Sequence, residues 1–236
     1  MFRNDFDIYL KPTYYIDSDH PEIVAFAREK CIKSRGEKEQ AISLFYAVRD
    51  GVRYDPYSME MNPISFKASE TLKRKKGYCV AKAILLASLA RVMGIPSRLC
   101  FADVRNHLTT ERLQEMMKTD IFVFHGYTEL YLDGGWIKAT PTFNNDLCTK
   151  FGVSPLEFDG KTDCMLHEFD EKGHKHMEYL KDHGQFADLP VEKMLISMRD
   201  AYPIFFQDSI QKIYGDFEKE AAADMVAKSG SGSKES

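Results

Sequence analysis

The longest regular pattern of apolar residues lies in the stretch KKGYCVAKAILLASLARVMGIPSRL, residues 75–99. Its apolar positions recur at intervals of three and four residues, and Gly94 and Pro96 end the pattern. This spacing predicts a helix from about Tyr78 to Met93. Because the helix is apolar on almost every side, we expect it to be central and buried.

A second pattern, in IFVFHGYTELYLDGGWIKATPTFN (residues 121–144), predicts a β-hairpin. Two runs of β-branched and aromatic residues flank Asp133 and Gly134, which form a preferred two-residue turn. That turn sets the register and pairs Leu132 with Gly135. The further pairs are Glu129 with Lys138, Tyr127 with Thr140, and His125 with Thr142. Alternation along the strands then gives a polar face and a core face. The polar face holds His125, Tyr127, Glu129, Lys138, Thr140 and Thr142, and the core face holds Phe122, Phe124, Leu130, Ile137 and Ala139.

Further helices are predicted around these two elements. The stretch DHPEIVAFAREKCI begins with a capping acid, Asp19, and EKEQAISLFYAVRDGV forms a second helix that ends at Gly51. Between the central helix and the hairpin, residues 103–120 predict a short helix capped by Thr109 or Thr110. That helix is either a wall of a substrate site or a connector on the surface.

No internal repeat or linker divides the chain, so we expect a single domain over residues 1–227. Its last part predicts one or two helices that break near Pro203. The final stretch, KSGSGSKES (residues 228–236), is rich in Ser and Gly and has no apolar anchor. A disordered tail is expected there.

Composition and charge narrow the classes of function. The chain has 236 residues, 44% of them hydrophobic, which is enough for a sizeable core. Its formal net charge is -4 and its basic residues are scattered, so no nucleic-acid partner is expected. No apolar run approaches a membrane span and the N-terminus is acidic, so we expect a cytoplasmic protein without a membrane partner.

The metal-binding residue types do not form a convincing site. Five cysteines, an odd number with no CxxC pair, argue against a disulfide framework and against structural zinc. The stretch DEKGHKHMEY reads more simply as a hairpin around Gly173 than as a metal site. We therefore expect no metal and no cofactor. The histidines among acids in this region are His167, His174, His176 and His183.

Cys79 and His125 are the candidates for nucleophilic chemistry. Cys79 lies in the first turn of the predicted central helix, where free backbone N–H groups and the helix dipole stabilise an anion. We expect this position to lower the thiol pKa from about 8.5 toward neutrality. Gly77 leaves open space beside the sulfur. His125 supplies a base that takes the thiol proton and later protonates a leaving group. Packing in the core is the alternative role for either residue alone.

Together the stretches ASETLKRKKGYCVAKAILLASLARVMGIPSR and FHGYTELYLDGGWIKATPT resemble the core of the transglutaminase-like superfamily. The resemblance covers about residues 40–145 and leaves 146–227 as a helical C-terminal extension. It implies an α+β, papain-like transglutaminase-core fold, in which the central helix packs on an antiparallel sheet and a Cys, His, Asp triad forms the site. The matching positions are Gly77, Cys79, Gly94, Ile95, Pro96, Arg98, His125, Trp136, Pro141 and Thr142.

One position departs from the family pattern, because Thr140 stands where the triad aspartate is expected. A threonine hydroxyl can accept the imidazole proton, but it brings no charge to stabilise an imidazolium. Thr140 is therefore the expected third catalytic residue, with Asn144 and Glu129 as alternatives. The residues expected to bind substrate are Tyr78, Tyr127 and Trp136.

The resemblance implies a thiol-dependent hydrolase or acyltransferase. Cys79 attacks an amide or thioester, His125 moves the proton, and a thioester intermediate forms on Cys79. The expected partner is a small-molecule or peptide acyl substrate, and the acceptor is left open between water, an amine and an internal nucleophile. The alternative is a catalytically silent transglutaminase-like module that binds a peptide or protein in the same cleft. The sequence predicts no oligomeric state.

Overall fold

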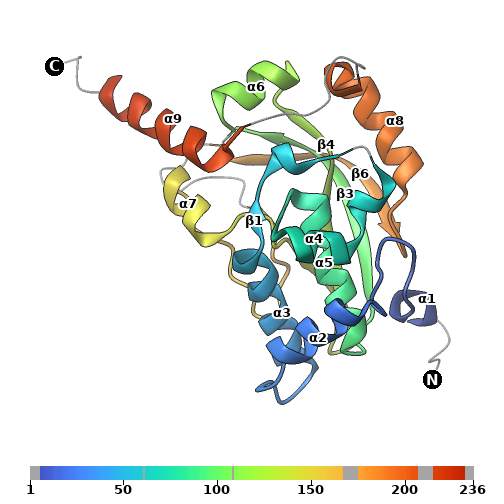
Figure 1. Ribbon diagram of the computed structural model, residues 1–236. Helices are drawn as coiled ribbons and strands as arrows, with labels where there is room; N and C mark the ends of the chain where they lie inside the picture. Colours follow the sequence, from blue (N-terminus) through green and yellow to red (C-terminus); the bar gives the residue numbers. More distant parts are fainter. Residues whose placement is uncertain (1–5, 61, 108, 167–174, 207–214, 232–236) are drawn as a thin grey trace.

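The computed structural model describes residues 6–60, 62–107, 109–166, 175–206 and 215–231, arranged around one helix and one sheet (Figure 1). The helices are α1 (Asp7–Leu10), α2 (Pro21–Lys30), α3 (Glu37–Gly51), η2 (Pro56–Ser58), η3 (Pro63–Phe66), α4 (Ala68–Arg74), α5 (Cys79–Val92), α6 (Glu111–Met117), α7 (Asn145–Phe151), α8 (Val191–Ala201), η4 (Pro203–Phe206) and α9 (Phe217–Ser231). The strands are β1 (Arg53–Tyr54), β2 (Lys76–Gly77), β3 (Ser97–Asn106), β4 (Ile121–Leu132), β5 (Gly135–Ala139) and β6 (Met177–Phe186). This mixture of helices and an antiparallel sheet confirms the predicted α+β fold.

Helix α5 is the central element, as its pattern predicts. It packs against α2, α3 and α4 and against strands β3 and β4 (Figure 1). Every residue from Val80 to Arg91 is buried. The buried residues include Lys82, whose ammonium donates to the carbonyls of Arg49 (2.9 Å) and Val52 (2.7 Å) at the end of α3. These bonds satisfy carbonyls that a helix end leaves open, and they fix the start of β1 beside α5.

The main sheet has four antiparallel strands in the order β5-β4-β3-β6. The predicted hairpin register is confirmed from Leu132 opposite Gly135 to Glu129 opposite Lys138. Asp133 and Gly134 both have positive φ, 50° and 88°, as a two-residue hairpin turn of type I′ requires.

The two outer pairs of the predicted register do not form. Strand β5 ends at Ala139, and the N–H of Thr140 donates to the carbonyl of Cys164 (3.0 Å) instead of to β4. Pro141 follows directly and has no N–H to offer, so the ladder cannot continue past it. Beyond Thr128, where His125 lies, β4 therefore pairs with only one of the described strands, β3.

Residues of both predicted faces of the hairpin are buried. Leu130, Ile137 and Ala139 are buried, as expected for the core face. Tyr127 and Glu129, on the predicted polar face, are only 4% and 5% exposed. Both faces of β4 are thus covered.

The N-terminal caps of two helices can be compared with the caps predicted from the sequence. Helix α2 is capped by His20, whose ring accepts from the N–H of Glu22, and not by Asp19. Because Pro21 is the first helical residue, the cap is the residue directly before it. Helix α6 is capped by Thr110, one of the two predicted residues, whose hydroxyl accepts from the N–H of Leu113.

The region after residue 145 is helical but also contributes a strand. Strand β6 joins the sheet beside β3, so the C-terminal extension is part of the main sheet. Helix α9 runs to Ser231, so residues 228–231 are helical and not disordered as predicted. An alanine-rich stretch with high helix propensity precedes them in the same helix. Residues 232–236 lie outside the described residues.

The described part of the chain can be searched for metal sites and for membrane-spanning helices. Among those residues no group of three or more His, Cys, Asp or Glu is arranged to hold a metal ion. His167, His174 and the predicted Gly173 turn lie outside the described residues. No described helix has the length and apolar character that a membrane crossing needs.

Candidate active site

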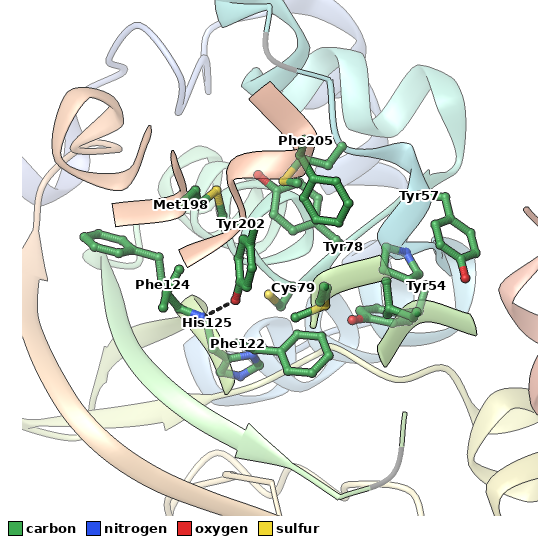
Figure 2. A pocket seen from close by; sticks show the side chains of 15 residues that line it. Tyr54, Tyr57, Tyr78, Cys79, Phe122, Phe124, His125, Met198, Tyr202 and Phe205 are labelled. Atoms are coloured by element: carbon green, nitrogen blue, oxygen red, sulfur yellow. Dashed lines mark hydrogen bonds between the residues drawn. The ribbon is translucent and has the colours of Figure 1, made fainter. Parts of the chain in front are cut away.

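Cys79 and His125, far apart in the sequence, line the same pocket at the start of α5 (Figure 2). Cys79 is the first residue of α5, and His125 lies on β4 where the strand runs beside that helix. The pocket has a cavity of about 60 Å³. Its described lining is Tyr54, Pro56, Tyr57, Met59, Tyr78, Cys79, Leu113, Met117, Phe122, Val123, Phe124, His125, Met198, Tyr202 and Phe205.

Gly126 explains how the strand comes so close to the helix. A Cβ atom on Gly126 would lie 2.9 Å from the Cα of Val80, which is closer than a side chain allows. Because glycine has no side chain, β4 can pass directly over the first turn of α5. The residue before this contact is His125, so the close approach brings the imidazole to the end of the helix that carries the thiol.

The Cys79 thiol is free, partly buried and protonated at neutral pH. Burial raises the pKa of Cys79 to about 11, although the backbone N–H groups of Gly126, Val80 and Cys79 itself act to lower it. The predicted lowering of this pKa toward neutrality is therefore wrong. The helix end does supply stabilising N–H groups, but loss of water around the sulfur outweighs them.

His125 is the second candidate catalytic residue in this pocket. Its side chain is buried, and burial lowers the pKa of His125 to about 4. Its Nε2 atom has no hydrogen-bond partner among the described residues. The imidazole is therefore uncharged at neutral pH, with one buried nitrogen available for a proton or a ligand.

None of the three candidates for the third catalytic position is hydrogen-bonded to His125 in the described part of the chain. The Thr140 hydroxyl donates to the sulfur of Met165 (3.5 Å). The Asn144 side chain accepts from the N–H of Tyr54 (3.1 Å), where it ties α7 to β1. Glu129 forms an ion pair with Arg98 (2.5 Å). Thr140 as the orienting group thus stays a prediction.

Of the three predicted substrate-binding residues, only Tyr78 is among the described residues that line the pocket. Tyr127 pairs with Cys100 inside the sheet and is buried there. Trp136 lies beside the turn of the hairpin, where the Arg98 guanidinium stacks on its ring at 4.1 Å. Neither residue is among the described lining of this pocket, so the contact of Tyr127 and Trp136 with substrate stays a prediction.

A β-bulge directly before His125 shapes the pocket edge. Ala102 pairs with His125 and Val104 with Phe122, so two residues of β4 lie opposite Asp103 alone. The second of the two, Phe124, has φ +55°, a backbone conformation that is rare for a large side chain. The bulge breaks the alternation of β4 and lets consecutive residues, from Phe122 to His125, line the pocket.

Side chains from outside the strand satisfy both N–H groups of the bulge. Asp103 Oδ1 accepts from the N–H of Phe124 (3.0 Å) and lies 2.6 Å from Nε2 of His183. The N–H of Val123 donates to the Tyr202 hydroxyl (2.7 Å), drawn as the dashed line in Figure 2. That hydroxyl in turn donates to the carbonyl of Ile121 (2.7 Å).

These supporting residues carry no sequence signal of their role. His183 and Tyr202 are about 80 positions from their partners, and a bulge without glycine has no characteristic motif. His183 also stacks on the Phe124 ring, with centroids 4.2 Å apart. The bulge before His125 is therefore held from three sides by β3, β6 and the residue after α8.

Three segments outside the central helix and the main sheet help to close the pocket: residues 54–59, α6 and the C-terminal extension. Helix α6 contributes Leu113 and Met117, so the predicted short helix is a wall of the pocket. The C-terminal extension contributes Met198, Tyr202 and Phe205, whose rings and sulfur face the same space as Cys79 in Figure 2.

Comparisons with known proteins place this architecture in a family. A sequence model of the transglutaminase-like superfamily matches residues 24–141, which include most of α2 and all of α3, α5, β4 and β5. No match was found among curated proteins. Two solved structures are similar to parts of the chain. One, from Cytophaga hutchinsonii and named a "putative cysteine protease", is 22% identical, with a TM-score of 0.47 over 60% of this chain. The other, from Parabacteroides distasonis and named a "putative protease", is 19% identical, with a TM-score of 0.38 over 58% of this chain.

The chain spans 43% and 25% of the lengths of these two proteins. The family match is independent of them and covers half of this chain, including both Cys79 and His125. This chain belongs to the transglutaminase-like superfamily.

Proposed function

We propose that the protein is a thiol-dependent hydrolase or acyltransferase that forms a thioester on Cys79. The observation that carries this proposal is the shared pocket, which is lined both by Cys79 and by a buried histidine whose Nε2 has no hydrogen-bond partner among the described residues. A nucleophile and an adjacent base are the two groups that acyl transfer through a covalent intermediate requires. Family membership supports the same chemistry.

The first step begins from a neutral thiol and a neutral imidazole. As Cys79 Sγ bonds to the acyl carbon, its proton moves to Nε2 of His125. The resulting imidazolium then protonates the leaving nitrogen or sulfur, and the bond between it and the acyl carbon breaks. In the second step His125 takes the proton of water or of another nucleophile as that nucleophile attacks the thioester. The bond between Cys79 Sγ and the acyl carbon then breaks, and the imidazolium returns the proton to the Cys79 thiolate. The proposal names the acyl donor only as an amide or a thioester, and it leaves the acceptor open between water and another nucleophile.

Backbone N–H groups are the donors that suit the developing oxyanion. The N–H groups of Cys79, Val80 and Gly126 lie close enough to the sulfur to lower the pKa of Cys79 against the larger effect of burial. Donors around the nucleophile can also bond the oxygen that becomes negative beside it. Such donors matter more for a neutral thiol and a neutral imidazole than for a preformed thiolate–imidazolium pair, because here the charges appear only during the reaction.

The direct test is acylation of the protein by small thioesters, followed by mass spectrometry of the intact chain and of its peptides. We expect the acyl group on Cys79 in the wild type and none in Cys79→Ala. The matched control is Cys164→Ala, which removes a buried cysteine that is not among the described lining residues. Acylation that persists in Cys79→Ala, or falls equally in Cys164→Ala, would contradict the assignment of the nucleophile.

The alternative is a silent member of the family that binds a peptide in the same pocket. One observation favours it: no described carboxylate bonds to His125, whose pKa burial lowers to about 4. On this alternative, no thioester acylates Cys79, while peptides still bind and Cys79→Ala leaves their affinity unchanged. The acylation experiment therefore separates the two functions.

A further inference from the structure

We propose that the acyl group that Cys79 accepts is short and apolar, and that it binds against a wall built by the C-terminal extension and α6. This inference rests on the proposed acyl transfer and names the substrate class for it. Neither a charged acyl group nor a long chain suits the pocket. The wall consists of Met198, Tyr202 and Phe205, together with Leu113 and Met117 of α6.

The described lining of the pocket carries no formal charge at neutral pH. None of its described lining residues is Asp, Glu, Lys or Arg. Burial keeps the titratable residues neutral, since it raises the pKa of Cys79 to about 11 and lowers the pKa of His125 to about 4. Burial also raises the pKa of Tyr54 and Tyr202, so their hydroxyls stay protonated. A carboxylate or ammonium on the acyl group would lose its water here and gain no counter-charge.

Part of the apolar lining is not fully buried in the hydrophobic core, so a ligand can contact it. Met59, Phe122 and Phe205 are only partly buried, and all three line the pocket. Three methionines, Met59, Met117 and Met198, surround the same space. Because methionine is flexible and apolar, such a lining adapts to small differences in the shape of a hydrocarbon group.

The cavity limits the size of the group. Its volume of about 60 Å³ is less than half of the roughly 150 Å³ of an apolar cavity that holds benzene. A group of about two to four carbons therefore fits without movement of the walls, whereas a longer chain has to displace a side chain such as Phe205.

Two buried polar atoms mark the other end of the ligand. Nε2 of His125 and the hydroxyl of Tyr78 are enclosed and have no hydrogen-bond partner in the described residues. Both residues are more than nine-tenths buried and line the pocket. Buried polar atoms normally have partners, so their state suits a site completed by the carbonyl and leaving group of a substrate. An apolar body with one carbonyl group meets both requirements.

The test compares acyl groups on one leaving group, using N-acetylcysteamine thioesters of acetate, butyrate, dodecanoate and succinate. We measure the second-order rate of Cys79 acylation for each. Two buried methylenes should make butyryl about tenfold faster than acetyl. Succinyl, similar in size to butyryl but charged, should be at least about a hundredfold slower than butyryl. Dodecanoyl should also be slower, because the cavity is short.

Two variants test which side chains form the wall that contacts the acyl group. Phe205→Ala should raise the rate with the dodecanoyl donor relative to the butyryl donor, while Ile196→Ala, on the exposed side of α8, should leave the ratio unchanged. A succinyl rate equal to the butyryl rate would overturn the apolar assignment and leave the nucleophile intact. If no donor acylates Cys79, the proposed function fails. Calorimetric titration of unreactive Cys79→Ala then decides the substrate class: preference for the butyryl donor supports it, and equal or preferred succinyl binding overturns it.

Discussion

The part of the chain that matches the family and the C-terminal extension contribute different things to one pocket. Residues 24–141 supply the reacting groups, Cys79 and His125, on a helix and a strand that pack directly together. The extension supplies apolar walls and two of the side chains that hold the bulge, His183 and Tyr202. The difference indicates that the reacting groups come from the part that matches the family, whereas the walls that contact a substrate come from both parts.

The largest expected effect comes from removing the base in the family core. We expect His125→Gln to slow acylation of Cys79 by about a thousandfold, because the thiol, with a pKa of about 11, then has no acceptor for its proton. Stopped-flow acylation with the butyryl thioester measures this loss.

Met198→Ala in the extension is the comparison for His125→Gln. It should alter the relative rates of the acyl donors by only a few fold, because it changes a wall and no reacting group. If Met198→Ala lowers the rate with every donor as much as His125→Gln does, the division of labour between core and extension is wrong.

The second expected effect is on stability and comes from the same histidine. Burial lowers the pKa of His125 from 6.5 to about 4, so the unfolded chain binds a proton at a pH where the folded protein does not. Above about pH 6.5 the titration of His125 does not change the free energy of unfolding. As the pH falls from there toward 4, the free energy of unfolding decreases. The loss amounts to about 3 kcal/mol in the free energy of unfolding.

Urea unfolding at pH 7 and pH 4.5 measures this dependence in the wild type and in His125→Gln. The variant should lose clearly less stability than the wild type over this interval, because glutamine does not titrate. An equal loss in both proteins would show that His125 is not held in a neutral, buried state. His183→Gln, which removes a histidine of the extension, is the matched comparison.

The third prediction concerns the link between the two regions. Asp103→Ala removes the acceptor of the Phe124 N–H and of His183, and we expect acylation to fall about ten- to hundredfold as His125 shifts. Asp103→Asn keeps an oxygen in the same place and should recover much of the rate. A shift of the acidic limb of the pH–rate profile in Asp103→Ala would identify an effect on His125.

The outcome that contradicts this link is a rate loss in Asp103→Ala that follows stability alone. In that case Asp103→Asn and Asp103→Ala would acylate equally slowly when the two variants are equally stable. Their pH–rate profiles would also be the same as that of the wild type. His183→Gln should give a smaller loss than Asp103→Ala, because the Phe124 N–H keeps its acceptor.

The sequence alone predicted the elements that depend on local pattern. The central helix and the hairpin turn at Asp133 and Gly134 follow from periodicity and turn chemistry, and both are confirmed. The bulge at Phe124 was not predictable, because its hydrogen-bond partners come from Asp103 and Tyr202, which no local rule connects to it.

The electrostatics of the site were predictable only in part. The position of Cys79 at a helix start correctly indicates stabilising N–H groups, yet the direction of the pKa shift was wrong. Burial depends on how α6, η4 and the residue Tyr202 cover the helix end, and these contacts are long-range. For the same reason the motif could not show that Tyr127 and Trp136 lie outside the described lining of this pocket, since a family motif does not state which side of the sheet is covered.

The smallest expected effect is at Thr140, which lies at the end of the family match where the family has an aspartate. Its hydroxyl donates to Met165 of the extension, so Thr140→Val should change the acylation rate by less than about threefold and the free energy of unfolding by about 1 kcal/mol or less. A rate loss of a hundredfold, with a changed pH–rate profile, would instead make Thr140 the group that orients His125. A small effect would mean that this pocket holds its imidazole by burial and by the bulge, and that the extension has taken over a task that the family assigns to a carboxylate.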